Sequence, residues 1–128
     1  MKIKITALDK MFSQYIRQIY NWTCQRCHKP YTPPTTSLHC SHFHGRGKKS
    51  VRFEPDNAVA LCFGCHQHFH ANPHEHVAFM EKRLGTQAYN RLLLLANIPK
   101  KPDYKAIKIW LKAMLKGQEE KDVVYGKH

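Results

Sequence analysis

The sequence has few acidic side chains and no long apolar run. Asp and Glu together number 9 in 128 residues, against 21 Lys and Arg, so the formal net charge is +12. No apolar run approaches the roughly 20 residues that cross a bilayer, and the first residues show no apolar signal core followed by a small-residue cleavage site. These absences argue against a membrane protein and predict a soluble, cytoplasmic chain.

The excess of positive charge predicts a polyanionic partner, because cationic side chains that neutralise phosphates release counterions. Basic residues are spread along the whole chain and are not gathered in one block, which favours nucleic acid over a membrane surface. The alternative is that the charge serves only solubility.

The length predicts one compact domain that buries about two thirds of its unfolded surface. Apolar residues recur at helical spacing on both sides of a segment rich in cysteine and histidine. The expected elements are strands at 38–42 and 57–61 and helices at 7–20, 73–84, 87–97 and 103–116. Thr6 with Asp9 marks the start of the first helix, Pro73 and Gly85 mark the start and end of the second, and Asp103 caps the last. We therefore expect a small, mostly helical α+β domain over residues 1–117, with its core at 22–71 and C-terminal helices at 73–116, and a flexible tail at 118–128.

Four of the five cysteines form two CxxC motifs. The two-residue gap lets both sulfurs of a pair converge on one ion, and Gly64 permits a tight turn in the second motif. Two such pairs predict a closed, tetrahedral structural Zn²⁺ site, whereas disulfides are rare in a reducing cytoplasm. The predicted zinc ligands are Cys24, Cys27, Cys62 and Cys65, and the alternative ligands are Cys40, His28 and His39.

The segment 38–70 holds most of the histidines, interleaved with basic residues. Histidine is the commonest metal ligand and titrates near neutrality, so the cluster suggests metal ligands, a general base, or both. If His66 and His70 lie on one helix, their spacing puts both on the same face. Taken singly, each of these histidines is more often structural than functional.

The order of these residues resembles the HNH endonucleases of the ββα-metal (His-Me) finger type, in their zinc-braced branch. The motif there runs CxxC, a histidine-bearing strand, Asn, and then CxxCH at the start of a helix. His42 falls at the first His, Asn57 at the Asn and His66 at the second His, while His70 lies one turn on. The finer pattern, SHFHGR followed by RFEPDNAVALCFGCH, is similar to NinG-type phage recombination nucleases. The likeness covers roughly residues 24–70.

The resemblance implies a ββα-metal finger braced by the four-cysteine zinc site, in a phage or prophage enzyme that nicks or cleaves DNA, in preference to RNA, in the bacterial cytoplasm. His42 would be the general base, and Asn57 would steady the strand hairpin. His66 and His70 would face a single catalytic divalent ion, either Mg²⁺, Mn²⁺ or Zn²⁺. The residues expected to hold flanking phosphates are Arg46, Lys48, Lys49 and Arg52.

One position departs from the family pattern. Many HNH proteins place an acidic residue or a second histidine just before the base, as a metal ligand, and here that position is Ser41. The alternatives for completing the metal shell are His44, Asp56, His68 and the phosphate itself. Two other functions also stay open: a non-catalytic zinc-finger protein that binds nucleic acid, and an adaptor that docks in a phage complex through its last two helices.

Overall fold

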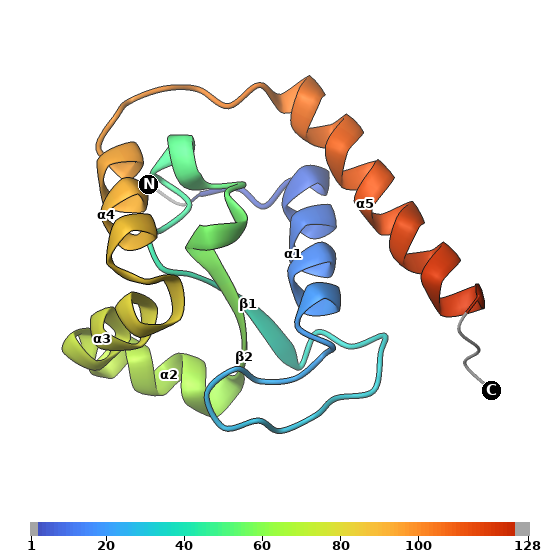
Figure 1. The fold of residues 1–128 in the computed structure, drawn as a ribbon, viewed down its shortest axis with the longest axis horizontal. Coiled ribbons are helices and arrows are strands. Elements are labelled where there is room, and N and C mark those ends of the chain that lie inside the picture. The colour runs from blue at the N-terminus through green and yellow to red at the C-terminus, as the bar shows by residue number, and fades with distance from the viewer. Residues whose placement is uncertain (1–2, 125–128) are drawn as a thin grey trace.

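Two antiparallel strands form the centre of the fold (Figure 1). The computed structural model describes residues 3–124, with side chains as far as Gly117. β1 (Leu38–His42) pairs with β2 (Ala58–Cys62) in a register that sets Leu38 opposite Cys62 and His42 opposite Ala58. The predicted second strand is displaced by one residue, because Asn57 ends a 3₁₀ turn and does not belong to the strand.

Helices cover the hairpin on two sides (Figure 1). One helix lies on the first side, three lie on the other, and the last helix packs against the outside of the first. They are α1 (Ala7–Ile19), α2 (Phe63–Ala71), α3 (Pro73–Leu84), α4 (Thr86–Ala96) and α5 (Tyr104–Val124), and 3₁₀ turns at Lys49–Val51 and Pro55–Asn57 lie between the strands. The predicted α+β class, with a small sheet and mostly helical structure, is confirmed.

The first helix begins where the sequence places its cap. The Oγ1 atom of Thr6 accepts a hydrogen bond from the amide of Asp9, and the Asp9 carboxylate accepts one from the amide of Thr6, which together form a capping box. One turn further on, Phe12 and Ile16 are fully buried. They join Leu111 of α5 in one apolar cluster, so α1 is held between the hairpin and the last helix.

Particular residues also determine the connections between the later helices. Pro73 stands at the first turn of α3, where its missing N–H costs nothing. Gly85 has φ +84°, a conformation that favours glycine, and it separates α3 from α4. Met80 of α3 packs with Leu61 and Phe69 in the apolar cluster that also contains Cys24 and Cys65.

The last helix is longer than the sequence analysis predicts. It begins as expected at Asp103, whose carboxylate accepts a hydrogen bond from the amide of Ala106. It then continues to Val124, whereas the pattern predicts an end near Lys116. Gly117 costs a helix only about 1 kcal/mol, and the residues after it are mostly helix formers. Residues 118–124 of the predicted tail are therefore helical, and 125–128 lie outside the described residues.

Candidate functional site

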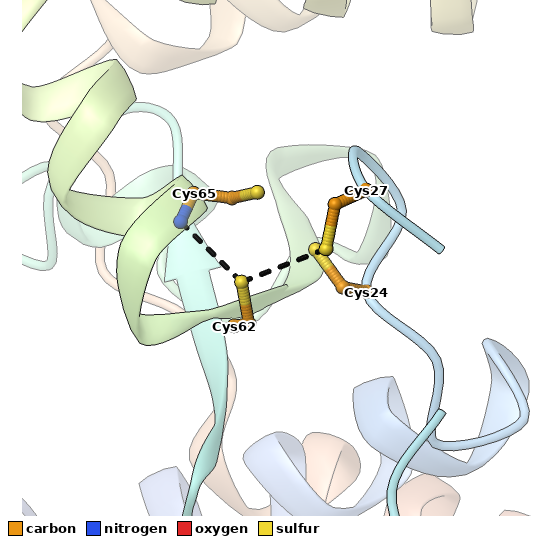
Figure 2. Close-up of side chains that lie close together, drawn as sticks. All are labelled: Cys24, Cys27, Cys62 and Cys65. Carbon is orange, nitrogen blue, oxygen red and sulfur yellow. Dashed lines mark hydrogen bonds between the residues drawn. The ribbon is translucent and has the colours of Figure 1, made fainter. Parts of the chain in front are cut away.

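The four cysteines of the two CxxC motifs meet in one cluster (Figure 2). Cys24 and Cys27 come from the loop after α1, Cys62 ends β2, and Cys65 lies in the first turn of α2. The amide of Gln25 donates to the carbonyl of Ala60 and so joins the first loop to β2. Segments that are far apart in the sequence thus present their sulfurs to one point.

The cluster fits zinc. The four sulfurs lie within 4.8 Å of one another, and the sulfurs of Cys27 and Cys62 are 3.8 Å apart. Zinc–sulfur bonds of about 2.3 Å in a tetrahedron place the sulfurs about 3.8 Å apart, which agrees with this spacing. All five cysteines are free thiols, so the disulfide alternative has no support here. The four sulfurs already fill a tetrahedral site without Cys40, His28 or His39.

The electrostatics of the cluster also favour the binding of a cation. Burial raises the pKa of Cys24, but hydrogen bonds from the backbone of Cys27, Cys62 and Arg26 outweigh it and lower the pKa to about 6. Burial raises the pKa of Cys65 to about 12, although Arg26 donates to its sulfur at 3.4 Å. Sulfurs this close can all be thiolates only when a metal ion neutralises them. The donor set and its geometry both suit a structural zinc ion.

His42 ends β1 with its two ring nitrogens in different surroundings. Nε2 lies 2.9 Å from the carbonyl oxygen of Arg52. A carbonyl only accepts, so Nε2 carries the proton and Nδ1 keeps the lone pair. Nδ1 is buried and has no hydrogen-bond partner among the described residues. Burial, and then the positive charge of Arg46, lower the pKa of His42 to about 4. The imidazole is therefore neutral near pH 7, with a basic nitrogen free.

Asn57 closes the loop that connects the two strands. Its side chain is fully buried. Its Oδ1 atom accepts from the amide of His44 at 2.8 Å, and its Nδ2 atom donates to the carbonyls of His44 at 2.8 Å and Val51 at 3.1 Å. The carbonyl of Asn57 accepts from the amide of Phe43. These bonds fix the backbone directly after His42.

The structure brings His66 together with His39, which the sequence analysis treats only as an alternative zinc ligand. The Nδ1 atoms of the two rings are 2.9 Å apart, and the ring planes cross at 79°. His70 lies one turn further along α2, is exposed, and makes no hydrogen bond or ion pair with any side chain that the structure describes. Apart from the four cysteines, residues 3–117 contain no group of three or more potential ligand atoms close enough to share an ion.

The residues expected to hold phosphates divide into two kinds. Arg52 donates from Nε and Nη2 to the carboxylate of Asp9, at 3.0 and 2.6 Å, and Arg46 lies 3.6 Å from the same carboxylate. Arg52 is thus engaged within the molecule. Lys48 and Lys49 are exposed. They line a cavity of about 420 Å³ into which the segment after α4 brings two further lysines, Lys100 and Lys101.

Three alternative ligands for the second metal are placed differently from one another. The Nε2 atom of His44 is buried without a partner, and so is the Oγ atom of Ser41. His68 pairs with the carboxylate of Glu75 on the exposed side of α2 and α3. Asp56 belongs to the second 3₁₀ turn. None of His44, Asp56 and His68 lies close enough to His39 and His66 to form a group of three ligands with them.

A larger open groove lies away from His42. It has a volume of about 1200 Å³ and runs between α1 and residues 31–36. Lys10 and Arg17 line it from the helix, and Trp22 and Tyr31 line it from the loop. Lys10 and Arg17 therefore face a groove whose lining includes none of the predicted catalytic residues.

Two residues that matter to the site lack a family signal in the sequence. Asp9 is buried at the start of α1 and pairs with Arg52, whose carbonyl holds His42. Its capping role is predicted from Thr6, but the contact with Arg52 is not. His39 lies two residues before Ser41 on β1. Strand alternation could have pointed to it, because residues 39 and 41 share one face of the strand.

Comparison with protein-family models, with curated proteins and with solved structures found no match for this chain. Within residues 3–124, no helix combines the length and the apolar character that crossing a membrane requires.

Proposed function

We propose that this protein is a metal-dependent endonuclease of the HNH type that hydrolyses phosphodiester bonds in DNA. The observation that carries the proposal is the state of His42. Its Nε2–H is held by the carbonyl of Arg52, and its Nδ1 is unpartnered at the end of a strand. An imidazole fixed by one nitrogen, with a lone pair on the other, is equipped to act as a general base.

In the proposed reaction, Nδ1 of His42 removes a proton from a water molecule. The water oxygen bonds to the phosphorus, and the bond from phosphorus to the 3′ oxygen breaks, which leaves a 5′-phosphate and a 3′-hydroxyl. His66 would hold the divalent ion, which would supply Lewis-acid stabilisation of the charge on the phosphate and the departing oxygen. The substrate phosphate brings negative charge near the imidazole and raises its pKa from about 4 toward the working pH.

Asn57 and Asp9 act as positioning residues in this scheme. Asn57 ties both ends of the loop, and Asp9 holds the Arg52 side chain whose backbone carbonyl orients His42. Neither needs to touch the substrate. This arrangement also supports the part that the HNH resemblance gives to Asn57.

The positive surface supports a nucleic-acid substrate. The net charge of +12 provides a sequence-independent attraction to phosphates. Lys48, Lys49, Lys100 and Lys101 border one cavity, so two segments can contact the same backbone. With Arg52 paired to Asp9, we assign phosphate contacts to Lys48, Lys49 and the partly buried Arg46.

Plasmid nicking tests the proposal. The zinc-loaded protein should convert supercoiled plasmid to nicked or linear forms with Mg²⁺, Mn²⁺ or Zn²⁺ present. His42→Gln and His42→Ala should slow cleavage by about 100-fold or more. His74→Ala is the matched control, because His74 is an exposed histidine on α3. Circular dichroism and zinc content confirm that each variant is folded. Cleavage at the wild-type rate by a folded His42 variant would refute the assignment of the base.

The same lysine cavity favours a second candidate, a module that binds nucleic acid without cutting it. In that case DNA binding weakens as salt rises, Lys48→Gln combined with Lys100→Gln reduces the salt dependence, and no ion produces nicks. Binding without cleavage across the three ions would select this function over the nuclease.

A further inference from the structure

We propose that His39 and His66 form a binding site for a divalent transition-metal ion, with Nδ1 of each ring as a ligand. The site stands on geometry alone. Side chains alternate along β1, so His39 and the proposed base His42 lie on opposite faces of the strand, and any part for this ion in catalysis rests on the nuclease function proposed above. The site gives the ion a strand ligand, His39, in place of the ligand that the family resemblance expects at Ser41.

The spacing of the two nitrogens suits a shared ion. Nδ1 of His39 and Nδ1 of His66 are 2.9 Å apart. Two metal–nitrogen bonds of about 2.05 Å that meet at about 90° separate their nitrogens by about 2.9 Å. Without an ion, only one of the two nitrogens can donate, so the rings would be restricted to opposite tautomers. A bound ion uses both lone pairs.

The structural zinc site holds both ligands in place. His66 directly follows Cys65 on α2, and His39 sits opposite Leu61 in the hairpin, next to Cys62. The ring of His39 also packs edge-on against Phe63, with centroids 5.9 Å apart. Rigid elements on both sides therefore present the nitrogens, which reduces the ordering cost of binding.

The position of His39 on its strand explains how an ion could be bound although Ser41 occupies the position where the family has a ligand. Side chains of a strand alternate between faces, so His39 and Ser41 share one face of β1. Ser41 is buried, and its short side chain makes no hydrogen bond with the described residues. The longer imidazole of His39, two residues earlier, reaches α2 and contacts His66. We therefore assign the strand ligand to His39, two residues before Ser41 on the same face of β1.

The ligand chemistry selects the kind of ion. Imidazole nitrogens suit Zn²⁺, Ni²⁺, Co²⁺ and similar first-row ions, whereas Mg²⁺ prefers oxygen ligands and retains its water. Only two protein ligands meet here, so other positions stay open to water or a phosphate oxygen. The site should bind Mn²⁺ or Ni²⁺ more tightly than Mg²⁺, and reversibly in contrast to the four-cysteine zinc.

Metal titration of the zinc-loaded protein tests the site. Ni²⁺ is added alone and its binding is followed by calorimetry, with electron paramagnetic resonance of free Mn²⁺ as the second measurement. We expect one added ion per chain. His39→Ala, His39→Gln and His66→Ala should each weaken binding at least tenfold, while His74→Ala binds like the wild type. Circular dichroism and a zinc count of one per chain establish that each variant is folded.

The possible results separate this inference from the proposed function. If folded His39 variants bind Ni²⁺ as tightly as the wild type, or if the wild type binds no added Ni²⁺, the site is refuted. Loss of the ion in His70→Ala but not in His39→Ala would assign the ligand to His70 and refute it too. If His39 binds the ion and no DNA is cut, the site stands and the nuclease function fails. If DNA is cut but no ion binding depends on His39, the metal site is refuted and the nuclease function stands.

Discussion

The carboxylate of Asp9 and the guanidinium of Arg52 form two parallel contacts, Nε to Oδ1 at 3.0 Å and Nη2 to Oδ2 at 2.6 Å. The Asp9 side chain is almost fully buried. Arg52 also donates to the carbonyl of Lys4, and its own carbonyl holds Nε2 of His42. The pair thus ties the start of α1 to the residue that orients the proposed base.

Replacing Asp9 should destabilise the fold in a manner that depends on pH. Asp9→Asn leaves the Arg52 charge without its partner and should cost about 3 kcal/mol at neutral pH. Burial opposes ionisation of Asp9, but hydrogen bonds from Arg52 and Thr6 lower its pKa from 3.8 to about 2. The stabilisation is therefore complete above pH 3.8 and is lost as the pH falls toward 2. Urea denaturation of the zinc-loaded wild type and Asp9→Asn at pH 7 measures the difference.

The difference between the two proteins is the informative quantity. Acid also protonates the four cysteines and releases zinc, so the gap in unfolding free energy is measured at pH 7 with one zinc bound per chain. In the Arg52→Gln background the gap caused by Asp9→Asn should shrink to under about 1 kcal/mol, because the partner charge is absent. A gap of the same size in both backgrounds would show that the charge of Asp9 is not what stabilises the pair.

Asn57 should be sensitive to loss of its carboxamide. Asn57→Ala leaves the amide of His44 and the carbonyls of His44 and Val51 without partners, which should cost roughly 2–4 kcal/mol. Asn97→Ala is the matched control, because the exposed Asn97 donates only to the carbonyl of Leu93 and should cost under about 1 kcal/mol. Thermal unfolding of the zinc-loaded variants compares them, and equal losses at the two positions would contradict this account.

The sequence predicted those features that depend on local chemistry. Thr6 and Asp9 set the start of α1, Pro73 and Gly85 set the ends of α3, and the CxxC pairs predicted the four-cysteine cluster. Contacts between distant segments could not be obtained in this way. The sequence alone does not specify how distant segments pack against each other. The contacts of His39 with His66 and of Arg52 with Asp9 are therefore visible only in the structure.

The ring of His42 should resist protonation in the free protein. Burial and the charge of Arg46 lower the pKa of His42 to about 4, so its ring should remain neutral down to about pH 5. In carbon–proton correlation spectra, the His42 Hε1 signal, assigned by its absence in His42→Gln, should not shift between pH 8 and about 5. Its Nε2 should appear as the protonated nitrogen. Titration near pH 6.5, the ordinary value, would contradict the environment described for His42.

Removal of the zinc should unfold the domain, because the four cysteines join the loop after α1 to the hairpin and α2. Structural zinc contributes on the order of 10 kcal/mol, which exceeds what a chain of this size can spare. A strong chelator should therefore abolish the helical circular dichroism signal, and Cys62→Ser should lack both zinc and that signal. Cys40→Ala is the control, because Cys40 lies outside the cluster and packs beside α1. It should keep one zinc per chain and lose only about 1–2 kcal/mol. A folded Cys62→Ser protein with no zinc would show that the apolar clusters hold the hairpin without the metal.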